Sequence, residues 1–170
     1  MSTLFGNIAT FYPLFVAEKH QTITSTMIGA VMGVFEFSIL ISSPIVAVTM
    51  QRVGRKRYIL LGNACIMFST VGFGLTHWIQ NDSAFFLSSL TLRFIQGFGD
   101  AACCTGILSI IASTFPGHRD LFFGYQETAV GLGLMLGPLL GNNLYTALGY
   151  ECTFYFSAII VALPLIASYM

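Results

Sequence analysis

The stretch Arg52-Val53-Gly54-Arg55-Lys56-Arg57 carries four of the chain's seven positive charges and separates two long apolar runs. Each run is long enough to cross a bilayer, for which a helix needs about 20 mostly apolar residues. Lys and Arg beside membrane helices resist translocation, so this basic hexad (residues 52–57) is expected on the cytoplasmic side. The hexad therefore predicts the orientation of the whole chain.

The composition indicates an integral membrane protein. Of the 170 residues, 55% are hydrophobic and only 8% are charged, whereas soluble domains are about a quarter charged. The lipid bilayer is thus the expected partner, in a plasma membrane or an intracellular vesicle membrane. The formal net charge is zero and there is no basic tail, which argues against a nucleic-acid partner.

Six apolar runs, separated by short polar stretches, predict an all-α protein with six transmembrane helices. The runs cover approximately residues 3–17, 26–50, 58–79, 84–115, 121–146 and 153–170. The breaks are too short to hold a soluble domain, so residues 1–170 are expected to form a single six-helix unit.

The loop charges agree with the orientation that the hexad predicts. Five loop cations are expected inside (Arg52, Arg55, Lys56, Arg57 and Arg119) and one outside (Lys19). Both termini are then cytoplasmic. The first run is short for a span and the chain stops where the sixth ends, which suggests part of a longer protein.

Four ionisable side chains fall inside the expected spans, namely Glu36, Arg93, Asp100 and Glu127. A charge at membrane depth costs about 2.5–3.5 kcal/mol on insertion scales, so such residues normally face a cavity or a partner and mark a functional path. A carboxyl group there also suits proton uptake and release. These four residues are therefore the first candidates for a transport or proton-coupling site.

Arg93 and Asp100 are seven residues apart and share one helix face, on which Gln96 completes a polar stripe. A structural alternative has about equal weight: Arg93 could form a salt bridge with Glu36 of a neighbouring helix and hold the bundle together. Glu127 lies only about six residues inside its helix, so it could instead reach the membrane interface.

A ridge of small residues follows Glu127 at four-residue spacing, formed by Gly133, Gly137 and Gly141. Such ridges let membrane helices approach closely. Lesser contact points are expected at Gly29 and Gly33 on the second helix and at Gly97 and Gly99 on the fourth. Pro138 removes one backbone donor and is expected to bend this helix. Close packing is the default interpretation of the ridge, since the spacing alone is weak evidence of function.

The sequence has no pattern typical of an enzyme, a cofactor site or a metal site. The four cysteines lack paired spacing and are expected to be small packing residues. His20, His77 and His118 lie near loops and are expected to be solvated interface residues. No cofactor and no metal are therefore expected, and a channel or membrane-embedded enzyme is disfavoured.

Taken together, three motifs resemble the N-terminal six-helix half of the major facilitator superfamily. In the loop expected after the second helix, Arg52-Val53-Gly54-Arg55-Lys56 matches the second part of the family pattern Gly-x-Leu-x-Asp-Arg-x-Gly-Arg-Arg/Lys. The first part departs, since Ala47 replaces Gly, Thr49 replaces Leu and Gln51 replaces the carboxylate. The resemblance implies a cytoplasmic gate formed by Gln51, Arg52, Gly54, Arg55, Lys56 and Arg57.

The other two motifs lie on later helices. Arg93-Phe94-Ile95-Gln96-Gly97-Phe98-Gly99 matches the pattern Arg-x-x-x-Gly-x-Gly, whose Arg is implicated in proton coupling in relatives. The segment from Gly133 through Gly137-Pro138 to Asn142 matches the antiporter pattern Gly-x-x-x-Gly-Pro-x-x-Gly-Gly, except for Asn142. This motif is similar to that of drug and vesicular amine or polyamine antiporters.

The resemblance implies half of a proton-coupled antiporter for a small organic, cationic and amine-like solute, with the substrate near the midplane between two halves. The expected partners are the solute, protons, and a missing C-terminal six-helix half or a second copy of this chain. The alternative is a truncated or accessory membrane protein without transport activity of its own.

Overall fold

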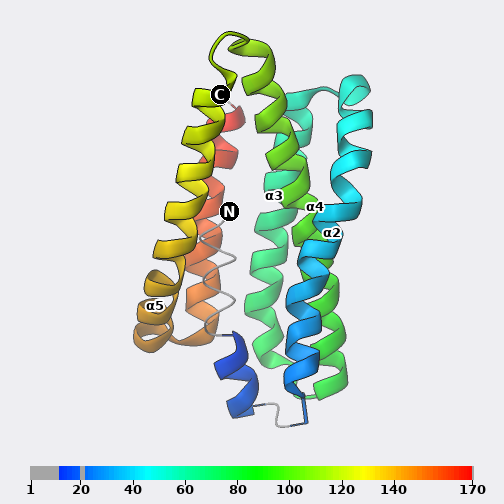
Figure 1. Ribbon diagram of the computed structural model, residues 1–170. Helices are drawn as coiled ribbons and strands as arrows, with labels where there is room; N and C mark the ends of the chain where they lie inside the picture. The colour runs from blue at the N-terminus through cyan, green and yellow to red at the C-terminus, as the bar shows by residue number, and fades with distance from the viewer. Residues whose placement is uncertain (1–11, 20–21, 170) are drawn as a thin grey trace.

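The computed structural model describes residues 12–19 and 22–169, and nearly all of them are helical (Figure 1). A helix over residues 12–19 precedes the longer elements. These are α2 (Ser25–Val53), α3 (Arg55–Leu75), the short 3-10 helix η1 (Thr76–Trp78), α4 (Asp82–Thr114) and α5 (Arg119–Tyr169). The expected all-α class is confirmed for this part of the chain, which has no strand.

The basic hexad is not the loop that the sequence predicted. Helix α2 continues through Val53, and α3 begins at Arg55, so Gly54 alone joins the two helices. Gly54 has φ 100° and ψ 142°, a conformation that only glycine adopts without strain. The chain can therefore reverse direction in one residue, and the basic side chains extend both helices.

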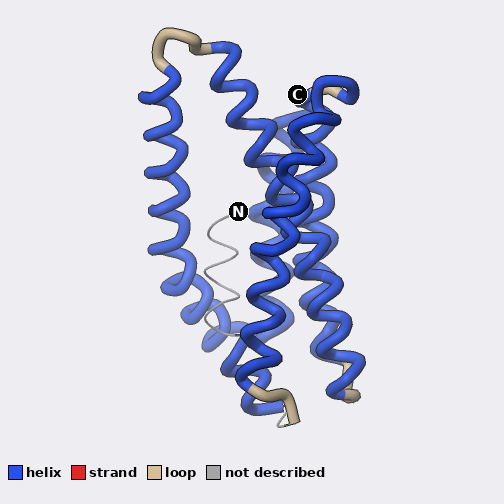
Figure 2. The backbone as a smooth tube through the Cα atoms, turned by 45° about the vertical axis from the view of Figure 1, so that its right-hand side comes forward, coloured by secondary structure: helices blue, strands red, loops and turns tan. Residues whose placement is uncertain are grey.

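Figure 2 shows that the described chain consists of long helices joined by short loops. Helix α4 packs against both α2 and α3, and both interfaces depend on glycine. A Cβ atom on Gly97 would lie 2.5 Å from the carbonyl oxygen of Phe35 on α2. A Cβ atom on Gly99 would lie 2.7 Å from the carbonyl oxygen of Gly62 on α3. The contacts expected at Gly97 and Gly99 are thus confirmed, because small residues let these backbones approach closely.

Two further glycines were expected to provide lesser contacts on α2, and this prediction is wrong for the described residues. No atom of that part of the chain lies within 4 Å of a Cβ placed on Gly29 or Gly33. Hydroxyl groups instead join the helices. Ser38 donates to the carbonyl oxygen of Phe94 at 2.7 Å, and Ser69 donates to that of Leu92 at 2.5 Å.

Helix α5 consists of two segments with a break at Gly149, where φ is 78° and ψ is −179°. Figure 1 shows the first segment running away from the hexad end and the second returning toward it. The apolar runs predicted a break between residues 146 and 153, but Tyr150 and Glu151 are already helical. The backbone also remains helical at Pro138, so the main change of direction occurs at Gly149 rather than at proline.

Within the part of the chain that the structure describes, three helical stretches are long and apolar enough to cross a membrane, namely Ser25–Val53, Arg55–Trp78 and Asp82–Thr114. Gly149–Ala162 is a shorter apolar helix. The six-span count remains a prediction, and residues 3–11 of the expected first span lie outside the described residues. The helix that is described there extends through Lys19, beyond the expected end at residue 17.

The largest buried cluster is aromatic and joins helix 12–19 to α3, α4 and the second segment of α5. Its buried members are Tyr12, Phe15, Val16, Ile23, Val31, Phe73, Phe85, Tyr150 and Phe154. Tyr12 stacks on Phe85 with ring centroids 6.0 Å apart, and Phe73 stacks on Phe154 at 5.5 Å. This cluster gives the bundle a well-packed core at the end opposite the hexad.

Candidate functional site

Arg93 is the largest fully buried side chain of the described residues, with 0% of its surface exposed. It lies on α4, where its Nη1 donates to Oε1 of Gln96, one helical turn later, at 3.1 Å. Its Nη2 lies 3.2 Å from the sulfur of Met32 on α2, and a thioether is a weak acceptor. The structure thus brings together two residues of the expected polar stripe, Arg93 and Gln96.

Aromatic rings complete the surroundings of the guanidinium group. Its central carbon lies 5.5 Å from the ring centroids of both Phe35 on α2 and Phe73 on α3. A cation over an aromatic face is stabilised by about 0.5–2 kcal/mol, with larger values where water is excluded. Arg93 therefore connects three helices through side chains that carry no charge of their own.

The structural alternative paired Arg93 with Glu36 of α2. Glu36 is exposed in this chain, and it is near enough to interact electrostatically with Arg93. Phe35, rather than Glu36, is the buried residue of α2 whose ring lies against the guanidinium group.

The carboxyl groups gather around the middle of α4. Asp100 is half-buried and interacts electrostatically with Glu36. The thiol of Cys104 lies 3.9 Å from Oδ2 of Asp100 and within electrostatic range of Glu127 on α5. Glu127 itself is exposed. Three helices thus bring their acidic side chains to one region, next to a single buried cation.

Sequence reasoning missed Met32, Phe35 and Phe73 as neighbours of Arg93. None carries a charge, so none was conspicuous in an apolar span. Which residues surround Arg93 depends on which face of α2 and of α3 turns toward α4. Hydropathy does not identify that face, because all faces of a membrane helix are apolar.

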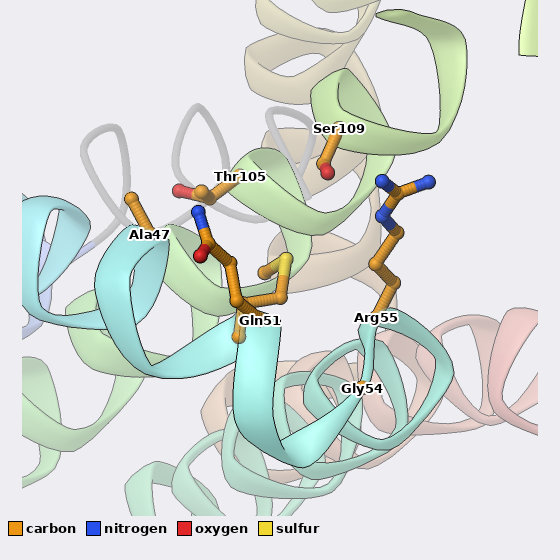
Figure 3. A pocket seen from close by; sticks show the side chains of 7 residues that line it. Ala47, Gln51, Gly54, Arg55, Thr105 and Ser109 are labelled. Carbon is orange, nitrogen blue, oxygen red and sulfur yellow. The ribbon is translucent and has the colours of Figure 1, made fainter. Parts of the chain in front are cut away.

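A pocket of about 590 Å³ lies beside the junction of α2 and α3. It is lined by Ala47, Met50, Gln51, Gly54, Arg55, Thr105 and Ser109. Figure 3 shows the amide of Gln51 directed toward Thr105 of α4, with Arg55 on the other side of the pocket. Three residues of the expected gate, Gln51, Gly54 and Arg55, therefore border this pocket.

The charged residues of the hexad are exposed, as is Gln51. Arg55 donates from Nη1 to the hydroxyl of Ser113 near the end of α4. Thr49 lies 2.6 Å from the hydroxyl of Tyr58 and also donates to the carbonyl oxygen of Ile45 at 2.6 Å. Because Thr49 has one hydroxyl hydrogen, Tyr58 is the donor between the two. Side-chain bonds thus connect α2, α3 and α4 around Gly54.

The expected glycine ridge is partly enclosed. Gly137 and Gly141 are buried and Gly133 is half-buried, whereas most neighbouring side chains of that segment are exposed. Pro138 is half-buried. One face of the first segment of α5 is thus covered and the other faces are open.

The described part of the chain contains no group of three or more His, Cys, Asp or Glu residues that could hold a metal ion.

Long apolar helices, glycine interfaces and a buried arginine at membrane depth define an integral membrane protein with a polar centre. The profile of the family described as Major Facilitator Superfamily matches residues 1–170. The chain therefore belongs to the major facilitator superfamily, and the resemblance stated from its motifs is confirmed.

The chain is also similar to individual members of this family. It is 30% identical over 159 residues to MFS-type transporter SLC18B1 of Mus musculus, a match that covers 94% of this chain and 34% of that protein. The Homo sapiens protein of the same name is 29% identical over the same length. Quinolone resistance protein NorA of Staphylococcus aureus is 26% identical over 164 residues, with 96% of this chain and 40% of that protein covered. The chain thus spans only about a third of the length of the first of these relatives.

Proposed function

We propose that this chain is one half of a proton-coupled antiporter that moves a small organic cation, such as an amine, by alternating access. The proposal assigns the solute and proton pathway to Glu36, Arg93, Gln96, Asp100 and Glu127. The hexad and Gln51 would form the cytoplasmic gate, and Gly137 with Pro138 would let the first segment of α5 pack and bend.

The observation that carries the proposal is the environment of Arg93. Arg93 contacts the uncharged side chains of Gln96, Phe35 and Phe73, and it interacts electrostatically with Glu36. Glu36 and Asp100 interact with each other electrostatically. Two carboxyl groups that repel each other at membrane depth favour the binding of a proton or an organic cation between them.

The names of the relatives support the solute class only indirectly. One relative is called an MFS-type transporter and another a quinolone resistance protein. Because this chain spans about a third of the first relative's length, we propose that transport requires a second six-helix half, or a second copy of this chain, to complete the cavity.

The test is amine uptake by vesicles with an acidic interior. The vesicles carry the protein encoded by the full reading frame to which this chain belongs. We expect radiolabelled amines to accumulate, and a protonophore to abolish the accumulation. Asp100→Asn and Arg93→Ala should remove the dependence on the proton gradient, because they change the charge of the proposed pathway.

Asp120→Asn is the matched control, since Asp120 is an exposed carboxylate in the first turn of α5. This variant should accumulate amines like the unmodified protein. Accumulation that persists after the gradient is collapsed would overturn the proton coupling. Absence of amine uptake, with the protein folded and inserted, would overturn the proposed solute class.

A further inference from the structure

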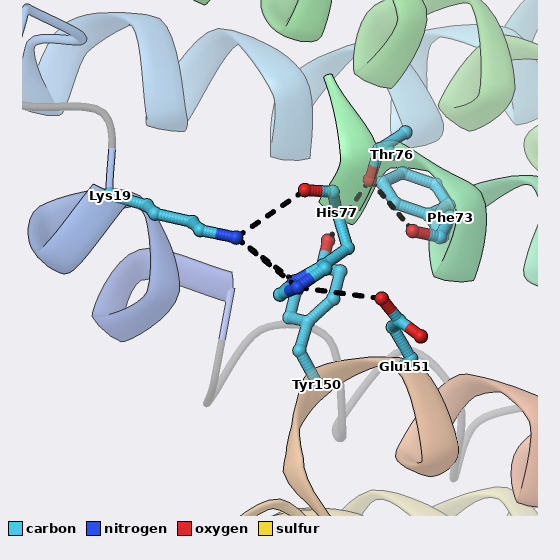
Figure 4. Close-up of polar contacts among 6 residues, drawn as sticks. All are labelled: Lys19, Phe73, Thr76, His77, Tyr150 and Glu151. Carbon is cyan, nitrogen blue, oxygen red and sulfur yellow. Dashed lines mark hydrogen bonds and ion pairs between the residues drawn. The ribbon is translucent and has the colours of Figure 1, made fainter. Parts of the chain in front are cut away.

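At the end of the bundle opposite the hexad, His77 of η1 lies between a cation and a carboxylate (Figure 4). The Nζ of Lys19 is 3.4 Å from Nδ1 and 3.2 Å from Nε2 of His77, and it also donates to the carbonyl oxygen of His77 at 3.4 Å. Oε1 of Glu151 is 3.4 Å from Nε2. We call Lys19, His77 and Glu151 the His77 cluster. It connects helix 12–19, η1 and the second segment of α5.

Neutral histidine can satisfy both neighbours at once. With its hydrogen on Nε2, the ring donates to Glu151 and accepts from Lys19 at Nδ1. A protonated ring carries hydrogen on both nitrogens and cannot accept. Lys19 would then face a positive charge, while the attraction between His77 and Glu151 would increase. Protonation of His77 therefore weakens its contact with Lys19 and strengthens its contact with Glu151.

Other ionisable groups near the cluster do not cancel this effect. Glu18, the neighbour of Lys19, accepts a hydrogen bond from Tyr145 of α5 at 3.5 Å. Asp82 at the start of α4 accepts one from Thr22. The hydroxyl of Tyr150 lies 3.3 Å from that of Thr76. Histidine is the side-chain type that ordinarily changes charge between about pH 5 and pH 8, and among the described residues of this end His77 is the one histidine.

The His77 cluster lies where helix 12–19 meets the second segment of α5, so a change in its charge would affect the contact between these helices. Tyr150 and Glu151 directly follow Gly149, where α5 changes direction. The ring of Tyr150 stacks on Phe15 of helix 12–19 with centroids 3.8 Å apart and lies 6.0 Å from the His77 ring. His77 keeps 32% of its side-chain surface exposed, so protons reach it from solution. A pocket of about 320 Å³, lined by Lys19, His77, Trp78, Ile79 and Gln80, lies beside it.

We propose that His77 is a protonation site separate from the centre around Arg93, and that its charge controls how firmly Lys19 holds helix 12–19 to η1. When His77 is neutral, Lys19 bonds to both its ring and its carbonyl oxygen. When His77 is protonated, the ring repels Lys19. Of these two bonds, Lys19 then keeps the 3.4 Å bond to the carbonyl oxygen, and the helix is loosened, while η1 stays joined to Glu151. The proposal does not depend on transport, since it rests on the contacts of this cluster.

Trp78 provides the first test because it is the chain's one tryptophan and its ring lies 6.1 Å from the ring of His77. Protonated imidazole quenches a nearby indole. In the full chain in lipid nanodiscs, we expect Trp78 emission to fall in one step as the pH is lowered from about 8 to about 5. His77→Gln should abolish the step, since glutamine can still accept from Lys19 and donate to Glu151 without titrating.

Hydrogen exchange provides the second test, because loosening raises the exchange of amides in the segment concerned. After correction for the chemical rate, amides of helix 12–19 should exchange several-fold faster at the acidic end of the range than at the basic end. His77→Gln should keep them slow throughout. Lys19→Gln should keep the pH-dependent step in Trp78 emission, because His77 is still present. It should abolish the pH dependence of amide exchange in helix 12–19, because it removes the positive charge that protonated His77 repels.

Each outcome decides the proposal. A Trp78 step that persists in His77→Gln would overturn the protonation site. Exchange of helix 12–19 that is independent of pH in the unmodified chain would overturn the control of the helix. Amides in the middle of α4 serve as the internal reference, because they lie far along the bundle from the cluster and should not respond. A failure of amine uptake would leave both readouts unchanged.

Discussion

Gly62 of α3 and Gly99 of α4 face each other so closely that neither can carry a side chain without displacing the other helix. A Cβ atom on Gly62 would lie 2.5 Å from the carbonyl oxygen of Gly99, and one on Gly99 would lie 2.7 Å from that of Gly62. The pair sits between Arg93 and the carboxyl-rich middle of α4, so it sets the spacing at which the candidate site is built.

Gly99→Ala should destabilise the protein by about 1–3 kcal/mol, the usual cost of overpacking. The added methyl group would contact backbone and the side chains of Ile66 and Cys65, and backbone cannot move aside. Unfolding in mixed micelles, followed by circular dichroism, measures the effect. Gly33→Ala is the control, since no described atom lies within 4 Å of its Cβ position, and it should be neutral or stabilising.

Gly54→Ala should cost roughly 1–3 kcal/mol for a different reason, the strain of a side chain at positive φ. There is open space around Gly54, and its φ is 100°, so the penalty is conformational rather than steric. The same unfolding measurement applies. Gly124→Ala, also in open space but without a positive φ, should be tolerated. Equal stability of the two variants would contradict the one-residue junction.

Gln96→Leu should lower the melting temperature, because it removes the acceptor 3.1 Å from the buried guanidinium of Arg93. Loss of one partner of a buried hydrogen bond costs about 1–3 kcal/mol. Gln96→Glu restores an acceptor, and a charged one bonds arginine more strongly, so it should melt at or above the temperature of the unmodified protein. A stable Gln96→Leu variant would show that Gln96 does not support Arg93.

The Thr49 and Tyr58 hydroxyls should be coupled across the junction of α2 and α3. A double-mutant cycle with Thr49→Val and Tyr58→Phe isolates their 2.6 Å bond, since the bond of Thr49 to Ile45 is lost equally in both arms. The expected coupling is about 0.5–1.5 kcal/mol. A coupling near zero would mean that this bond does not stabilise the hexad region.

Much of the local structure could be predicted from the sequence. The apolar run expected over residues 26–50 lies within α2 (Ser25–Val53), and the run over 84–115 nearly coincides with α4 (Asp82–Thr114). The hexad was misjudged because its charges looked like a loop, whereas Arg and Lys are good helix formers and one glycine is enough for the turn. The break in α5 was placed within about two residues, since glycine was the visible signal.

The candidate site was only half visible in the sequence. Arg93, Gln96 and Asp100 stood out because polar residues are rare in apolar spans. Their partners were not visible: Phe35 of α2 lies against the guanidinium group of Arg93, whereas Glu36, the partner in the structural alternative, is exposed. A one-residue difference on α2 decides this, since adjacent residues of a helix point about 100° apart and Phe35 faces α4.

By itself, the sequence determined the membrane class, the helical segments and the polar residues at membrane depth, because hydropathy and charge act locally along the chain. The tertiary structure alone decided which helix faces meet: Gly62 against Gly99, Arg93 among Phe35, Phe73 and Gln96, and His77 between Lys19 and Glu151. In a helix that is apolar on all sides, the contact face is chosen by close packing and by a few hydrogen bonds, and these depend on residues far apart in the sequence.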